Sequence, residues 1–319
     1  MTDSPYNPWL HRLAVLTACV ALLPILMGAL VTTKDAGMAF PDWPSSDGHN
    51  MLLYPWLKSA GAKFLEHGHR LAGILIGLAS IALAIAAWRG ERRAWVRYLA
   101  CTVLAAVVVQ GILGGQRVRL DERGLAFVHG SFAALVLALM AVVAVITSRG
   151  WYAVSVRDAR QTPGRLRWLA LATCGCVFLQ YVLGGLLRHR GTALFEHLGF
   201  AFVAALMVIW LALSAAVSGI AWLRVPAGIL ALLVVAQLAL GAGAWVTKFG
   251  FGGHVAVYGS LLQDVVRTSH VLCGMLLFVT TVVLTVRIAR LHGLLSGAAG
   301  RDVTRIACDA SLPLAGGAR

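Results

Sequence analysis

Eight long apolar runs constrain most strongly what this chain can fold into. Each run is about 20 residues long, which is the length that an α-helix needs to cross the hydrocarbon core of a bilayer. The runs cover roughly residues 13–33, 64–88, 95–115, 125–147, 168–187, 194–217, 225–246 and 263–287. Hydrophobic residues make up 59% and charged residues 13% of the 319, which leaves no room for a separate soluble domain. The sequence therefore predicts an all-α polytopic membrane protein with eight transmembrane helices.

The net charge of +14 comes from the segments between and after these runs. Arginines cluster after the second, fourth and eighth runs, which all end on the same side of an eight-span chain. Because short cytoplasmic loops are enriched in Lys and Arg, we expect an inner-membrane protein with both termini in the cytoplasm. The loops 34–62, 116–124, 188–193 and 247–262 then face outward. We expect lipid as a partner and no nucleic acid.

The cysteines predict no disulfide on the outward side. All six lie in apolar runs or in the C-terminal tail, at Cys19, Cys101, Cys174, Cys176, Cys273 and Cys308. A structural disulfide forms in an oxidising compartment and would need cysteines in the outward loops.

The odd-numbered runs share a motif near their outward ends. The third, fifth and seventh carry Gln-x-x-Leu followed by a small pair, starting at Gln110, Gln180 and Gln237. The first run has Pro24 one turn before its small pair, Gly28-Ala29. This recurrence indicates an internal repeat. Small pairs let helices pack closely in lipid, and they also leave room for a flat ligand; the sequence leaves both explanations open.

The even-numbered runs each begin with a histidine. These residues are His69, His129, His197 and His270. All four enter from the outward side, so we expect them at one depth in the membrane. The pattern predicts two pseudo-symmetric four-helix bundles, residues 1–150 and 165–292, joined by a cytoplasmic linker at 151–164 and followed by a tail at 293–319.

Pairs of histidines from facing helices favour heme over a bare metal ion. Neutral imidazole binds zinc, copper, iron and heme iron. Zinc or copper sites usually add thiolates, carboxylates or a tight histidine cluster, and His67-x-His69 is the one such spacing here. Single histidines on facing helices suit the two axial positions of a heme. The sequence therefore predicts two heme irons, one bound by His69 and His129 and one by His197 and His270, with His67 as an alternative to His69.

A heme also carries two propionate carboxylates, for which arginine is the usual partner. The candidates near the histidines are Arg70, Arg117, Arg188 and Arg267. The alternative is that such arginines anchor helix ends at the membrane interface. We expect the histidines outside the two pairs, at positions 11, 49, 189, 254 and 292, to be solvated.

Glu66 distinguishes the first half from the second. At i, i+3 it shares a helix face with His69, and Arg70 follows at i+4. No carboxylate stands at the matching position before the other three histidines. We infer that the first half performs chemistry on its heme and that the second holds a heme for electron transfer. The alternative for Glu66 is an ion pair with Arg70 alone.

The outward loop 34–62 contains Pro41-Asp42-Trp43-Pro44, together with Tyr54 and Trp56. Aromatic residues of this kind either cover the bundle beneath them or form a belt at the membrane interface. A cover over the first site is our preferred interpretation.

The sequence resembles the heme A synthase family in four features taken together. These are Glu66-x-x-His69-Arg70, the Gln-x-x-Leu-Gly-Gly motifs, the Pro-Asp-Trp-Pro loop and the histidines of the even runs. The resemblance covers about residues 10–290. It implies an oxidoreductase that converts the C8 methyl of heme O to the formyl group of heme A by successive hydroxylations, for cytochrome c oxidase. Many bacterial members carry a cysteine pair in the first outward loop, which this chain lacks.

The resemblance also implies a role for each half. Heme O would be the substrate of the first half, with Glu66 as the catalytic residue and His69 and His129 on the iron. Heme b would be the cofactor of the second half, bound by His197 and His270. A heme O synthase and an electron-transfer protein are the implied partners. The alternative function is a di-heme b electron-transfer subunit that does not modify heme, and a heme transporter ranks last.

Overall fold

The computed structural model describes residues 6–310, with side chains described for residues 6–293. Its helices are α1 Pro8–Val20, α2 Leu22–Thr33, η1 Trp56–Lys58, α3 Gly61–Gly90, α4 Ala94–Arg119, α5 Arg123–Thr147, α6 Arg149–Ala153, α7 Val156–Gln161, α8 Gly164–Arg190, α9 Leu194–Ala216, α10 Ala221–Phe249 and α11 Leu261–Ala310. Within this part of the chain, eight helical segments are long and apolar enough to cross a membrane, α1 and α2 together forming the first. The predicted all-α membrane fold is confirmed.

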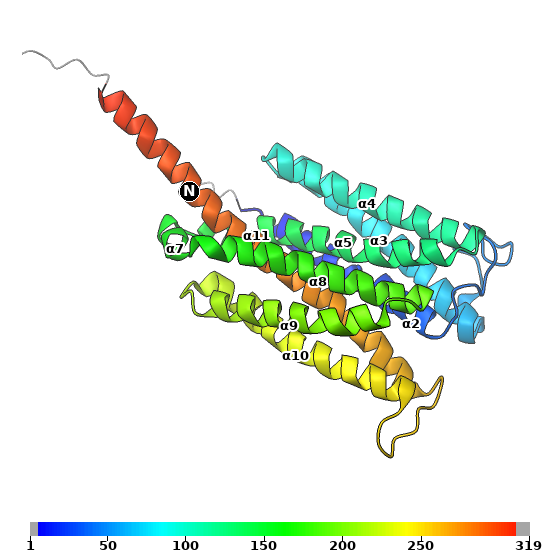
Figure 1. Cartoon of the computed structure of the whole chain (residues 1–319). Helices are drawn as coiled ribbons and strands as arrows, with labels where there is room; N and C mark the ends of the chain where they lie inside the picture. Colours follow the sequence, from blue (N-terminus) through cyan, green and yellow to red (C-terminus); the bar gives the residue numbers. More distant parts are fainter. Residues whose placement is uncertain (1–5, 311–319) are drawn as a thin grey trace, which may run out of the picture.

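The eight spans pack as two rings of four helices (Figure 1). In the first ring α3 lies between the α1–α2 span and α4, and α5 closes the ring by contacting α4 and α1. In the second ring α8, α9 and α10 follow one another, and α11 closes on α8. The two rings meet where α2 and α5 contact α8 and α11. The segment between the rings forms the short helices α6 and α7.

Corresponding helices of the two rings bury corresponding residues. Buried positions of α3 are Ile76, Ser80, Leu83 and Ala87. Those of α9 are Ala204, Val208, Leu211 and Ala215, each at the same separation from His197 as its counterpart has from His69. Because these separations follow the 3.6-residue period of a helix, His69 and His197 enter their rings on the same face of their helices.

Proline explains two irregularities in the spans. A proline inside a helix cannot donate to the carbonyl four residues earlier and crowds it. Pro24 stands four residues after Val20, the last residue of α1, and the first span breaks there into two helices. Pro226 of α10 leaves the carbonyl of Trp222 free, and Arg287 Nη1 donates to this carbonyl over 2.6 Å.

The predicted tail at 293–319 falls largely outside the described side chains. The backbone of α11 continues to Ala310, and residues 311–319 lie beyond the described part. Cys308 belongs to this region. The five cysteines within the described side chains are free.

Candidate functional site

The four histidines of the even spans come together in two pairs. His69 on α3 and His129 on α5 have ring centroids 6.1 Å apart and ring planes at 85°. His197 on α9 and His270 on α11 repeat this arrangement, with 6.3 Å and 87°. A metal ion held between two imidazoles by metal–nitrogen bonds of about 2 Å keeps the ring centres roughly 6 Å apart. Each ring of helices therefore holds two imidazoles at the spacing of axial ligands to one iron.

A glycine from the preceding odd span lies against each histidine ring. A Cβ atom added at Gly28, Gly114 or Gly184 would lie 2.9 Å from Cε1 of His69, His129 or His197, respectively. A Cβ atom added at Gly241 would lie 3.1 Å from Cε1 of His270. Side-chain carbons essentially never approach other atoms to 2.9 Å, so a larger residue at Gly28, Gly114 or Gly184 would displace the ring, and at Gly241 the ring would have to shift by a few tenths of an ångström. The small pairs seen in the sequence thus have a specific purpose, because the first residue of each pair makes room for an imidazole.

The first pair is held in the tautomer that binds metal. Nδ1 of His69 lies 2.8 Å from the backbone carbonyl of Pro24, and Nδ1 of His129 lies 3.1 Å from that of Gln110. A carbonyl oxygen only accepts, so Nδ1 carries the hydrogen in both rings and Nε2 keeps its lone pair. Metal-bound histidines are commonly oriented by such a hydrogen bond from the second nitrogen.

The glutamines of the repeat support the histidine turns. The Nε2 atoms of Gln110 and Gln180 donate to the carbonyls of His129 and His197, both over 2.9 Å. The Nε2 atom of Gln237 lies 3.4 Å from the ring Nε2 of His270, the same distance as between Gln110 Nε2 and the ring Nε2 of His129. Nδ1 of His270 has no hydrogen-bond partner, although the backbone of Gln237 acts on the ring. The second pair is therefore held less completely than the first.

These pairs fit a heme better than a bare metal ion. Within residues 6–293 no group of three or more His, Cys, Asp or Glu residues could hold a metal ion. Two imidazoles fall short of the four ligands of a structural zinc site, but they suffice for a porphyrin iron, whose macrocycle supplies the other four ligands. All four histidine side chains are only half-buried, so protein atoms do not fill the space in front of them.

Glu66 is buried beside the first pair, with 1% of its surface exposed. Its Oε1 accepts a hydrogen bond from Arg70 Nη2 over 2.6 Å, so the ion pair considered from the sequence is present. Its Oε2 accepts from the backbone N–H groups of Ala39, over 2.7 Å, and Phe40, over 3.3 Å. The carboxylate therefore also attaches the loop to α3.

Two arginines hold the same loop over the first ring. Arg70 Nη1 donates to the carbonyls of Asp42 and Ser45 over 2.9 and 2.7 Å. Arg117 Nη2, at the end of α4, donates to the carbonyl of Gly37 over 3.0 Å. Both guanidinium groups thus contact loop backbone beside the histidine pair, and the loop covers the first ring.

The arginines of the second ring are arranged differently. Arg188 Nη2 donates to the carbonyl of Ala29 over 2.7 Å and to Thr33 Oγ1 over 2.8 Å, both in the first ring. Arg267 is close enough to Arg188 to interact with it electrostatically. Two neighbouring guanidinium groups form a site for an anion. It stays a prediction that the heme propionates are bound by Arg70, Arg117, Arg188 and Arg267.

The remaining histidines correct the sequence analysis in part. His49 and His254 are exposed, as expected. His11, His189 and His292 are half-buried, so their predicted solvation is wrong. For His189 the reason is that α8 continues to Arg190, which carries the histidine against Gly130 of α5. His67 is fully buried beneath the loop, and it is His69 that pairs with His129.

Comparison with known proteins shows which proteins part of this chain is similar to. Residues 57–196 match the family of cytochrome oxidase assembly proteins, COX15-CtaA. The heme A synthase of Shouchella clausii is 32% identical over 129 residues, 40% of this chain and 42% of that protein. Over this part of its length the chain is similar to a heme A synthase. The heme A synthase of Symbiobacterium thermophilum is 28% identical over 193 residues, which are 58% of this chain and 61% of that protein. The heme A synthase of Lysinibacillus sphaericus is 29% identical over 198 residues, which are 59% of this chain and 61% of that protein.

These matches support the heme A synthase family, although the chain spans only 42% to 61% of the length of these three curated relatives. The segment matched by the family contains Glu66, His69, Arg70 and His129 and ends one residue before His197. The first pair, with its carboxylate, therefore lies in the region shared with the family.

Proposed function

We propose that this protein is a heme A synthase, which oxidises the C8 methyl of heme O to the formyl group of heme A. The observation that carries the proposal is the difference between the two histidine pairs. Their ring geometries are nearly equal, but the first pair alone has a buried carboxylate, Glu66, three residues before a histidine and a loop held over it. One pair is equipped for chemistry and the other for holding a cofactor.

Open space beside the first pair also supports this assignment. Gly73 lies one turn before the buried Ile76 and so faces inward on α3, yet it is exposed and a Cβ added there meets no atom within 4 Å. The same holds for Gly111 on α4. The matching positions of the second ring carry Ala201 and Leu238. Heme O has a long hydroxyethylfarnesyl chain where heme b has a vinyl group, so the roomier first ring suits heme O.

In this proposal His69 and His129 bind the iron of heme O through Nε2, and His197 and His270 bind that of heme b. A heme b in the second ring would supply one-electron transfer. Arg188 and Arg267 would face its propionates. The loop over the first ring would cover the bound heme O on its outward side.

Glu66 acts in two ways in this proposal. Three donors hold its carboxylate, which favours the charged form. A fixed negative charge stabilises positive charge that develops on the methyl carbon during oxidation. The same hydrogen bonds keep the loop in place.

The proposed setting follows from the charge pattern and the family. The protein would lie in the inner membrane with both termini in the cytoplasm and both histidine pairs near the outward face. A heme O synthase would deliver the substrate, and an electron-transfer partner would be needed for turnover.

The test is extraction and mass analysis of the hemes bound to the purified protein from cells that make heme O. We expect heme b with heme A, or with an oxidised heme O, in the wild type, and heme b with heme O in Glu66→Ala. Glu196→Ala is the matched control, because this exposed glutamate adjoins His197, and it should behave like the wild type. Heme b alone in all three proteins would overturn the proposal.

That last result would instead favour a di-heme b electron-transfer subunit. The near-identity of the two pairs, 6.1 and 6.3 Å with ring planes at 85° and 87°, is the observation in favour of it. Such a carrier has no use for Glu66 beyond attaching the loop, so Glu66→Ala would leave its heme content and composition unchanged.

A further inference from the structure

His67 is a buried histidine with one ring nitrogen unused. It lies two residues before His69, on the opposite side of α3, since two residues turn a helix by about 200°. Its side chain is 1% exposed, and its Nδ1 lies 3.1 Å from Ser46 Oγ. Its Nε2 is buried without a hydrogen-bond partner; the backbone of Met51 acts on the ring but lies outside hydrogen-bonding geometry. Buried polar atoms are nearly always paired, so this one calls for a partner.

The hydrogen bonds of Ser46 favour the tautomer of His67 that carries its hydrogen on Nε2. Arg70 Nη1 donates to Ser46 Oγ over 3.4 Å, so the hydroxyl oxygen accepts there. The hydroxyl hydrogen is then free to donate, and Nδ1 of His67 is the acceptor beside it. A neutral imidazole with an accepting Nδ1 carries its hydrogen on Nε2. The unpaired atom is therefore a donor, and its ligand must supply an acceptor.

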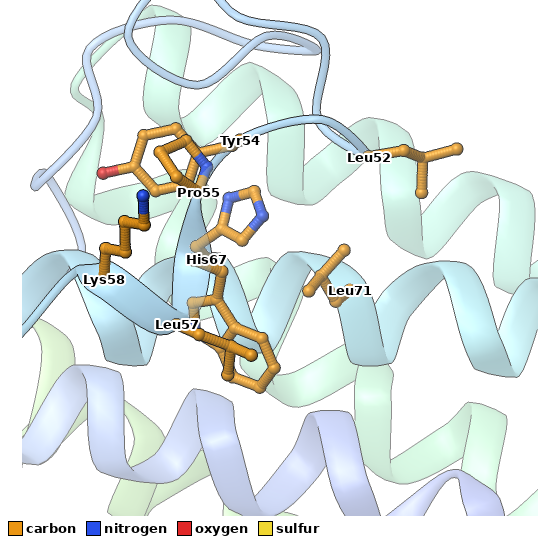
Figure 2. Close-up of a pocket in the computed structure, with 8 residues that line it drawn as sticks. Leu52, Tyr54, Pro55, Leu57, Lys58, His67 and Leu71 are labelled. Atoms are coloured by element: carbon orange, nitrogen blue, oxygen red, sulfur yellow. The ribbon is translucent and has the colours of Figure 1, made fainter.

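His67 lines a cavity of ≈ 330 Å³ between α3 and the loop segment before it. Figure 2 shows the ring of His67 among Tyr54, Pro55 and Leu71. The lining also includes Leu57, which is 84% exposed, so the cavity has an apolar mouth at the histidine end of the bundle. Pockets of about 300 Å³ or more, largely apolar with a few polar groups, are typical of small-molecule sites.

We propose that this cavity binds the head group of a lipid-soluble quinone, with one quinone carbonyl accepting the hydrogen bond of His67 Nε2. A neutral acceptor suits the position, because burying a charged group costs free energy unless an opposite charge is buried with it. The cation of the lining, Lys58, is exposed and thus placed for the mouth of the cavity. An apolar mouth at the membrane boundary admits a ligand that arrives through lipid.

A quinone also fits the electron balance of the proposed function, on which this part of the inference rests. Oxidation of a methyl group to a hydroxymethyl group, with water as the oxygen source, releases two electrons and two protons. Reduction of one quinone to a quinol takes up two electrons and two protons. His67 and His69 lie on opposite sides of the same turn of α3, so the thickness of one helix separates the cavity from the site where those electrons would be released.

The test measures binding of decylubiquinone to the full-length protein in phosphatidylcholine nanodiscs, with bound quinone quantified after separation from free quinone. His67→Phe keeps a ring and removes the donor, so we expect the affinity to fall about tenfold. Leu71→Trp fills the cavity and should abolish binding. His49→Phe, in the same loop, and Leu75→Trp, one turn further along α3, are matched controls at exposed positions and should bind like the wild type.

The heme content of each preparation shows whether a variant has folded. Absence of quinone binding by the wild type, or equal binding by the wild type and both cavity variants, would overturn the proposal. A third result would also overturn the proposal: the wild type retains phosphatidylglycerol but binds no quinone, and His67→Phe loses the phosphatidylglycerol. The cavity would then hold a lipid head group. Quinone binding needs no heme O, so its failure and a failure of the synthase test are distinguishable.

Discussion

Arg188 of α8 donates a hydrogen bond to the backbone carbonyl of Ala29 in α2 over 2.7 Å. Ala29 comes directly after Gly28, and Gly28 lies against the ring of His69. Arg188 comes one turn after Gly184, and Gly184 lies against the ring of His197. One guanidinium group therefore connects the helix that packs on the first histidine pair with the helix that packs on the second. This contact helps to hold the two rings together, alongside the packing of α5 on α8 and α11.

Replacing Arg188 by alanine should loosen the contact between the rings. The carbonyl of Ala29 and the hydroxyl of Thr33 would lose a charged donor, at a cost of about 1–3 kcal/mol. Thermal unfolding of the protein in detergent measures the loss. Thr33→Val combined with Arg188→Ala should give less than the sum of the single effects, because the two residues share one hydrogen bond. Arg190→Ala, at the exposed next-but-one position, is the control and should leave the melting temperature unchanged.

Adding a methyl group beneath one histidine should empty one heme site selectively. Gly114→Ala places a carbon 2.9 Å from Cε1 of His129, and Gly184→Ala does the same to His197. We expect the first variant to lose most of its heme in the first ring and the second variant most of its heme b. Heme content per protein and the spectrum of the remaining heme measure this. Gly175→Ala, at an exposed position of α8 where an added Cβ meets no atom within 4 Å, should retain both hemes; equal loss in all three variants would contradict the assignment of ligands.

The stability of the opposite end of the bundle should depend on pH through Glu91. Burial would raise the pKa of this carboxyl, but the hydrogen bonds and charge of Arg93 outweigh it and lower the pKa below its ordinary value of 4.5. A lowered pKa in the folded state means that the ion pair stabilises the protein above that value and that this contribution is lost as the pH falls through the folded-state pKa.

Glu91→Gln should therefore lower the melting temperature at pH 7, and the difference from the wild type should shrink on acidification below about pH 4. Arg93→Gln should give the same profile, because Arg93 provides the partner charge. A difference that stays constant between pH 7 and pH 3.5 would show that the two residues act by packing alone.

The membrane spans and the four histidines were predictable because both signals are local. Crossing the bilayer requires an uninterrupted apolar helix, so the length of each run is informative by itself. A histidine at the start of an apolar helix is costly to leave unused, and its recurrence at His69, His129, His197 and His270 indicated two ligand pairs without knowledge of neighbouring helices.

The contacts around these residues were not predictable, because they depend on which helices are neighbours. The glycine pairs were open to two explanations from the sequence, and their contact with the histidine rings follows from the phase of one helix against the next. Glu66 shares a face with His69 on any helix, but its hydrogen bonds to Ala39 and Phe40 depend on the path of a loop. Apolar length and polar spacing thus determined the spans and the candidate ligands. Only tertiary packing decided the contacts of the glycines with the histidine rings, the attachment of the loop to Glu66 and the burial of His67, since these arise between segments far apart in the chain.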